Sequence, residues 1–131
     1  MKAPSMQMLL KHKRFWIAVG LAFVLLVIYL SVTPRPLNVP KWGGLNIGHM
    51  LAYGWLMFWF SQVFRRPGQR VAVFAAFRAM GTGLEYIQGM IGRDFSYLDM
   101  RDDGIGLVIG AILAMTPLGN SLAMIEAWLK A

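Results

Sequence analysis

Four long apolar stretches, separated by short polar segments, dominate the pattern of the chain. A transmembrane helix needs about 20 mostly apolar residues, and about 17 suffice at the lower limit. Four segments fall in that range, at approximately residues 15–32, 47–64, 71–92 and 102–122. The first two contain no charged residue, whereas the third contains Arg78 and Glu85. This pattern predicts an all-α fold, in which a single domain over residues 1–131 forms an integral membrane bundle of four transmembrane helices.

The start of the first span and the end of the fourth span need separate arguments. Lys11, Lys13 and Arg14 precede the first apolar run, as in a signal peptide, but the run is long and no A-x-A cleavage site follows it. We therefore expect an uncleaved first span. Thr116-Pro117 should kink or end the fourth helix. Residues 118–131 then either complete that span or lie along the membrane interface.

The composition supports a membrane protein and excludes several other classes. Hydrophobic residues make up 57% of the 131 residues and charged residues 15%, with a mean hydropathy of +0.53. These values exclude a disordered chain and disfavour a soluble globule. The net charge is +7, but the basic residues form short clusters between apolar runs, so we expect no nucleic-acid partner. The lack of cysteine excludes disulfide scaffolds and thiolate metal sites.

The distribution of basic residues predicts the orientation of the bundle, because cytoplasmic loops carry an excess of Lys and Arg. One side of the predicted membrane has eight of them: Lys2, Lys11, Lys13, Arg14, Arg65, Arg66, Arg70 and Lys130. The other side has four: Arg35, Lys41, Arg93 and Arg101. We therefore expect both termini and the 65–70 loop in the cytoplasm, with segments 33–46 and 93–101 outside.

The polar residues of the third span share one face. At about 100° per residue, an arc of roughly 120° contains Arg78, Gly81, Thr82, Glu85, Gln88, Gly89 and Gly92. The opposite face contains Met80, Leu84, Tyr86, Ile87, Met90 and Ile91. A charge exposed to lipid costs about 2.5–3.5 kcal/mol, so the polar face should point into the bundle. We expect Arg78 to extend toward the cytoplasmic end of its helix.

The second span supplies partners for that polar face. His49 and Tyr53 are four residues apart and therefore lie on the same side of a helix. At 1.5 Å per residue, they reach about the same depth in the membrane as Glu85 and Gln88. We expect these four side chains to meet. The alternative for His49 is a purely structural role, because a lone histidine in a helix is more often a hydrogen-bonded structural residue.

The fourth span begins with acidic residues and continues with small ones. Asp99, Asp102 and Asp103 cluster near its outer end. Ser96-x-x-Asp99 also has the spacing of a helix cap, so capping alone is an alternative explanation for Ser96, Asp99 and Asp102. Arg93 either forms an ion pair with Asp94 or Asp99 in the outer loop or holds an anionic ligand. A stripe of small residues predicts close helix packing at Gly106, Gly110 and Ala114.

Familiar catalytic motifs are absent from the sequence, which contains no H-E-x-x-H, G-x-S-x-G or P-loop. His49, Glu85 and Asp103 are residue types that coordinate divalent metals, but they come from three different spans without diagnostic spacing. We therefore predict no metal and no cofactor. Enzymatic activity is left open, with Glu85 and His49 as the candidate catalytic residues.

The order of the polar residues resembles the VanZ-like family of small bacterial membrane proteins. The resemblance covers residues 46–110 and rests on three blocks, which are His49-x-x-x-Tyr53, Glu85-x-x-Gln88, and Arg93-x-x-Ser96-x-x-Asp99 continuing through Asp103 to Gly106-x-x-x-Gly110. Two positions depart from the family pattern. Leu45-Asn46 stands where the family usually has Asp-Lys, and Asp103 stands where it usually has Asn. The resemblance implies a multi-helix envelope protein, in a family with one class linked to resistance to the glycopeptide teicoplanin.

We therefore expect a multi-pass protein of the bacterial inner membrane with an outward-facing polar pocket. The expected ligand is the head group of an envelope lipid or cell-wall precursor. Its binding residues would be His49, Tyr53, Glu85, Gln88, Arg93, Ser96, Asp99 and Asp103. One alternative is a membrane hydrolase or transferase that uses Glu85 or His49 as general base. Others are proton-coupled transport along Arg78 and Glu85 in an oligomer, and a scaffold that pairs with another membrane protein through the third span.

Overall fold

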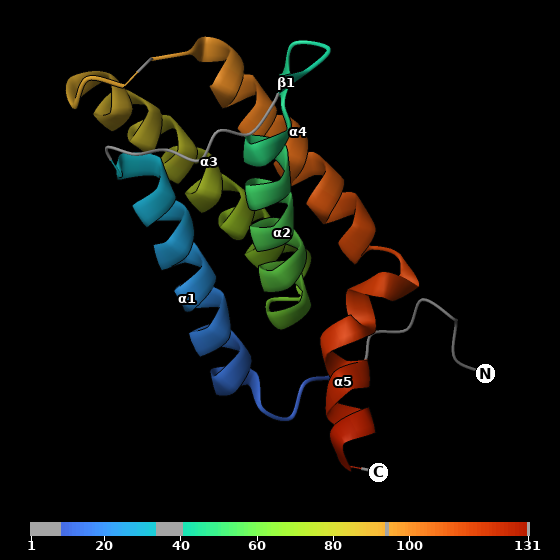
Figure 1. Cartoon of the computed structure of the whole chain (residues 1–131). Helices are drawn as coiled ribbons and strands as arrows, with labels where there is room; N and C mark the ends of the chain where they lie inside the picture. The colour runs from blue at the N-terminus through green and yellow to red at the C-terminus, as the bar shows by residue number, and fades with distance from the viewer. Residues whose placement is uncertain (1–8, 34–40, 94, 131) are drawn as a thin grey trace.

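The structure is a computed structural model that describes residues 9–33, 41–93 and 95–130. Five α-helices account for most of these residues (Figure 1). They are α1 (Lys13–Val32), α2 (Ile47–Val63), α3 (Pro67–Met90), α4 (Tyr97–Ala114) and α5 (Ser121–Lys130), with a 3₁₀ turn, η1 (Pro117–Asn120), between the last two. The prediction of an all-α fold is therefore confirmed.

The helix starts have local causes. The Asn46 side chain accepts a hydrogen bond from the backbone N–H of His49 (3.3 Å) and caps α2. Ser96 caps α4 in the same way, accepting from the N–H of Asp99 (3.3 Å). The first helical position of α3 is Pro67, which has no N–H to satisfy. These caps place the starts of α2 and α4, which carry most of the polar residues of interest.

The fourth predicted span is shorter than expected. It was expected to reach residue 122, but α4 ends at Ala114 and the segment Pro117–Lys130 bends away by 77°. Pro117 begins η1, and the Thr116 hydroxyl caps this turn by accepting from the Leu118 N–H (3.2 Å). The predicted break at Thr116-Pro117 is therefore confirmed, and α5 does not continue α4 in a straight line.

A short β-hairpin precedes α2 and was not predicted. Strands β1 (Lys41–Trp42) and β2 (Leu45–Asn46) pair antiparallel around Gly43 and Gly44. Both glycines have positive φ angles, of 55° and 77°, which residues with a side chain rarely adopt. Pro34, Pro36 and Pro40, which precede the hairpin in the sequence, lie outside the described residues.

Helix α2 lies at the centre of the molecule and packs most closely on α4 (Figure 1). The contact uses the predicted stripe of small residues. A Cβ atom at Gly106 would overlap the backbone of Met50, and one at Gly110 would overlap the carbonyl oxygen of Gly54. Only glycine lets the two backbones approach this closely. The stripe therefore holds the second half of α4 against the first half of α2.

Among the described residues, α1 is the one helix that is both long enough and apolar enough to cross a membrane alone. The bent pair of α4 and the segment 117–130 meets the same requirement only when taken together. Helix α2 has 17 residues, and α3 carries Arg70, Arg78 and Glu85. The structure thus contains a helix for each predicted span, but only the first is by itself long and apolar enough to cross a membrane.

Candidate functional site

The polar face of α3 points into the molecule. Glu85 is 1% exposed and Gln88 4%, whereas Tyr86 and Met90 on the other side are 54% and 83% exposed. Three residues depart from the prediction: Leu84, assigned to the outer face, is buried, whereas Gly89 and Gly92, assigned to the polar face, are exposed. Helix α3 contacts α1 as well as α2 and α4, so its buried arc is wider than the polar arc.

His49 lies between two carboxylates of α4. Its Nδ1 is 2.6 Å from Oδ1 of Asp103, and its Nε2 is 3.8 Å from Oδ2 of Asp99. Tyr53, one turn further along α2, stacks near the imidazole with ring planes 20° apart. An ionised carboxylate can only accept, so with Asp103 ionised the ring proton lies on Nδ1. The lone pair of Nε2 then faces Asp99.

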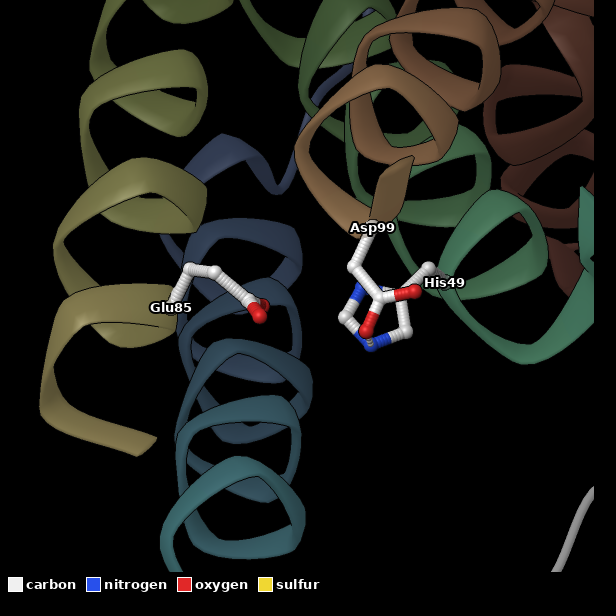
Figure 2. Close-up of side chains that lie close together, drawn as sticks. All are labelled: His49, Glu85 and Asp99. Atoms are coloured by element: carbon white, nitrogen blue, oxygen red, sulfur yellow. Dashed lines mark ion pairs between the residues drawn. The ribbon is translucent and has the colours of Figure 1, made fainter. Parts of the chain in front are cut away.

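Glu85 approaches the same group of side chains from α3 (Figure 2). Its Oε1 accepts a hydrogen bond from the backbone N–H of Ser96 (2.5 Å), and its other oxygen accepts none from a described residue. One ligand atom each from His49, Glu85 and Asp99 lies within 4.8 Å of the other two. Side chains from three helices therefore converge at one point near the start of α4.

Asp103 contacts α3 at a glycine. Its Oδ2 is buried without a hydrogen-bond partner in the described part of the chain and would lie 2.6 Å from a Cβ atom at Gly81. Tyr53 would come within 3.3 Å of the same atom. Gly81 therefore leaves the space that Asp103 occupies when it contacts His49.

The hairpin places Asn46 on the acidic residues of α4. The backbone N–H of Asn46 donates to Oδ2 of Asp102 (2.8 Å), and its side-chain amide donates to Oδ1 of Asp99 (3.2 Å). Asp102 also pairs with Arg101 (3.0 Å), which in turn donates to the Gly44 carbonyl. Asp102 thus holds the hairpin against α4. The capping explanation accounts for the side chain of Ser96 but not for that of Asp99, which bonds to Asn46 instead.

A pocket of about 190 Å³ lies beside this cluster, at the end of α1 and the start of α2. The polar groups that line it are Ser31, Asn46, His49, Tyr53, Gln88 and Arg93. Of the eight predicted ligand-binding residues, the structure places His49, Tyr53, Gln88 and Arg93 around the pocket. The other four lie beside the pocket. Three of them, Glu85, Asp99 and Asp103, form what we call the acidic cluster, and Ser96 adjoins it.

Arg93 has a contact that the sequence did not predict. Its Nη1 donates to the carbonyl oxygens of Leu30 (3.1 Å), Ser31 (2.5 Å) and Thr33 (3.3 Å), which close the C-terminus of α1. A cation is favourable there because the last carbonyls of a helix lack partners and carry partial negative charge. Arg93 therefore makes no ion pair with Asp99, and the alternative partner Asp94 lies outside the described residues.

Arg78 also differs from expectation. Its guanidinium group donates to the carbonyl oxygen of Met100 in the first turn of α4, rather than extending toward the cytoplasmic end of α3. Gly104 makes room for it, because a Cβ atom there would lie 3.1 Å from Nη1 of Arg78. Arg78 thus links α3 to α4.

Two polar residues that line the pocket, Ser31 and Asn46, were missed by the sequence reasoning. Asn46 caps α2, binds two acidic residues of α4 and lines the pocket. Its position just before a helix would have been a usable signal, because asparagine is among the preferred N-cap residues.

Comparison of the chain with protein-family models, with curated proteins and with solved structures finds no significant match.

Proposed function

We propose that this protein is a multi-spanning protein of the bacterial inner membrane whose pocket binds the head group of an envelope lipid or cell-wall precursor. The resemblance to the VanZ-like family motivates this choice of ligand. The observation that carries the proposal is a pocket whose polar lining includes hydrogen-bond donors that have no partner among the described residues, placed inside helices whose outer surfaces are apolar.

The distribution of exposed and buried residues supports a lipid environment. Leu25, Leu51 and Ile112 lie on the outer faces of three helices with exposed fractions of 67%, 67% and 55%. Glu85 and Gln62, by contrast, are each 1% exposed. Exposed apolar surface costs about 25 cal/mol per Å² in water, but a bilayer core removes this cost. Charges inside a membrane protein normally face the bundle interior, as they do here.

The helix lengths and the basic residues support four crossings with the pocket outside. Helices of 17 to 24 residues are about 26 to 36 Å long, compared with a hydrocarbon core of about 30 Å. The start of α1, the α2–α3 connection and α5 lie at one end of the molecule (Figure 1). The described basic residues at this end are Lys11, Lys13, Arg14, Arg65, Arg66, Arg70 and Lys130. This end would be cytoplasmic.

The pocket offers donors suited to an anionic head group. The Tyr53 hydroxyl makes no hydrogen bond with a described residue, although the side chain is only 3% exposed. Arg93 donates through Nη1 to carbonyls at the end of α1, and no described residue accepts from its Nε or Nη2. A guanidinium N–H and a phenol are strong donors to phosphate or carboxylate oxygens.

Binding of polyprenyl phosphate to the purified protein in detergent tests this proposal. We expect saturable binding that weakens about tenfold in Tyr53→Phe, which removes one hydrogen bond to a charged group and leaves the ring. Tyr86→Phe is the matched control, because Tyr86 is exposed on the outer face of α3. Equal affinity of the two variants, or binding that never saturates, would argue against the pocket.

A catalytic function is the second candidate, because Asp103 holds His49 in the way a carboxylate orients a general base. Turnover of a lipid-linked sugar substrate that is lost in His49→Ala would favour a hydrolase or transferase. Binding without turnover would favour the first proposal. The scaffold hypothesis receives less support, because Glu85 and Gln88 are covered by helices of the same chain.

A further inference from the structure

The acidic cluster has more negative groups than cationic contacts. Glu85, Asp99 and Asp103 surround a single imidazole, and among the described residues the ion pairs of these acids involve His49 alone. Arg78 donates to a backbone carbonyl and is not paired with them. Unpaired carboxylates are costly to bury. The cluster therefore favours a bound cation.

The orientation of His49 matches that of a metal ligand. Metal-binding histidines commonly donate their other ring N–H to a carboxylate, which fixes the tautomer and the ring. Asp103 is in this position at 2.6 Å from Nδ1, and its side chain is 1% exposed with Oδ2 buried and unpartnered. Nε2 of His49 is directed at Asp99 and is free to bind a metal.

The two carboxylates that face this nitrogen are also held in place. Asp99 is fixed through Oδ1 by the side chain of Asn46, which leaves Oδ2 facing His49. Glu85 is fixed through Oε1 by the N–H of Ser96. The separation of 3.8 Å between His49 and Asp99 is close to the roughly 3.4 Å expected for two ligands of a tetrahedral ion at about 2.1 Å.

We propose that His49, Glu85 and Asp99 bind a divalent transition-metal ion of the Zn²⁺ type, and that Asp103 positions the imidazole (Figure 2). One imidazole and two carboxylates suit Zn²⁺, whereas Mg²⁺ and Ca²⁺ prefer oxygen ligands alone. Three protein ligands leave a coordination position for water or a ligand oxygen. From the sequence we predicted no metal, and the donor residue types noted there were His49, Glu85 and Asp103 rather than Asp99. This proposal goes beyond head-group binding and does not depend on it.

Metal analysis of the full chain, purified without a histidine tag and treated with EDTA, tests the site directly. After addition of Zn²⁺ alone and removal of the excess, we expect about one Zn²⁺ per chain by mass spectrometry. His49→Ala and Glu85→Gln should each lose it. His12→Ala and Glu126→Gln are matched controls, because they change the other histidine and a buried acid at the opposite end of the molecule. Both should keep it.

Two further variants separate binding from folding and from positioning. Asp99→Asn alters a partly exposed ligand and should abolish Zn²⁺ binding while leaving the helical circular dichroism unchanged. Asp103→Asn should weaken Zn²⁺ binding by about 10- to 100-fold, as expected for an outer carboxylate. Wild-type protein without stoichiometric Zn²⁺, or unchanged Zn²⁺ binding in Asp99→Asn, would overturn the metal site. Neither result would affect the test with polyprenyl phosphate, which uses Tyr53.

Discussion

Single glycines decide whether the polar side chains of this protein can meet. Asp103 reaches His49 only because Gly81 on the facing helix has no side chain. Gly104 provides similar space for Arg78. These contacts connect three helices at one level. The polar cluster is therefore sensitive to changes of one methyl group at positions that carry no chemistry themselves.

Gly81→Ala should destabilise the protein, because the new Cβ atom would lie 2.6 Å from Oδ2 of Asp103 and 3.3 Å from Tyr53. Overpacking of this kind typically costs about 1–3 kcal/mol. Gly83→Ala is the matched control two residues along the same helix, where nothing lies within 4 Å. It should be neutral or slightly stabilising, by up to about 1 kcal/mol. Thermal unfolding in detergent measures both, and equal effects would contradict this account.

At the scale of elements, α5 holds the start of α1. The carboxylate of Glu126 accepts the backbone N–H groups of Lys11 and His12, both at 2.8 Å, and the indole N–H of Trp16 at 2.7 Å. The cap residue His12 makes no side-chain capping bond itself. Glu126 therefore accepts hydrogen bonds from backbone N–H groups at the start of α1 from a distant part of the chain, as Asn46 does locally at the start of α2. The bend before α5 is what brings it to this position.

The contact of Glu126 makes stability depend on pH. Burial by itself would raise the pKa of Glu126. Hydrogen bonds from the N–H groups of Lys11, His12 and Trp16 lower the pKa by more than burial raises it, so it lies below its ordinary value of 4.5. The folded state then binds fewer protons than the unfolded state. The stabilisation is complete above pH 4.5 and is lost as the pH falls through the lower, folded pKa.

Glu126→Gln should therefore be less stable than the wild type at pH 7, by on the order of 1 kcal/mol. The difference between the two proteins should shrink as the pH falls below 4.5. Unfolding curves at pH 7, 5, 4 and 3 measure it. A difference that stays constant over this range would show that the charge of Glu126 is not responsible.

At the scale of the whole molecule, the two ends have different character. One end contains the start of α1, the Arg65–Arg70 region and α5, where Arg65 donates to the side chain of Asn120 (2.7 Å). The other contains the hairpin, the end of α3 and the start of α4, with the pocket and the acidic cluster (Figure 1). In the proposed membrane arrangement, the side that each end faces decides which compartment supplies the proposed ligand.

Labelling of single cysteines tests this orientation, since the chain has no cysteine of its own. Trp42→Cys places a thiol on the hairpin, where Trp42 is 76% exposed. Gly68→Cys places one at the start of α3, where a side chain meets nothing within 4 Å. A membrane-impermeant maleimide should label Cys at position 42 in intact spheroplasts and Cys at position 68 only after permeabilisation. The reverse pattern would place the pocket in the cytoplasm.

Much of the fold follows from local pattern. Apolar runs and breakers predict the helices and the end of α4 at Thr116-Pro117, and the 3.6-residue period predicts which side of α3 is buried. The Gly43-Gly44 turn carried a usable hairpin signal that was not recognised. The candidate site is predicted as a set of residues, but the contacts within it are only partly predicted. His49 meets Asp103 and Asp99, whereas Arg93 turns to the end of α1.

Helix positions and their polar faces are properties of neighbouring residues, so the order of amino acids is enough to specify them. Side-chain contacts between helices depend on the distance between the helix axes and on the rotation of each helix about its own axis. Residues far apart in the chain determine both together. The tertiary structure alone therefore assigns Asp99 to the open nitrogen of His49, Asp103 to the other nitrogen, and Glu126 to the start of α1. A displacement of one helix by an ångström would redistribute these contacts, because hydrogen bonds weaken steeply with distance and angle.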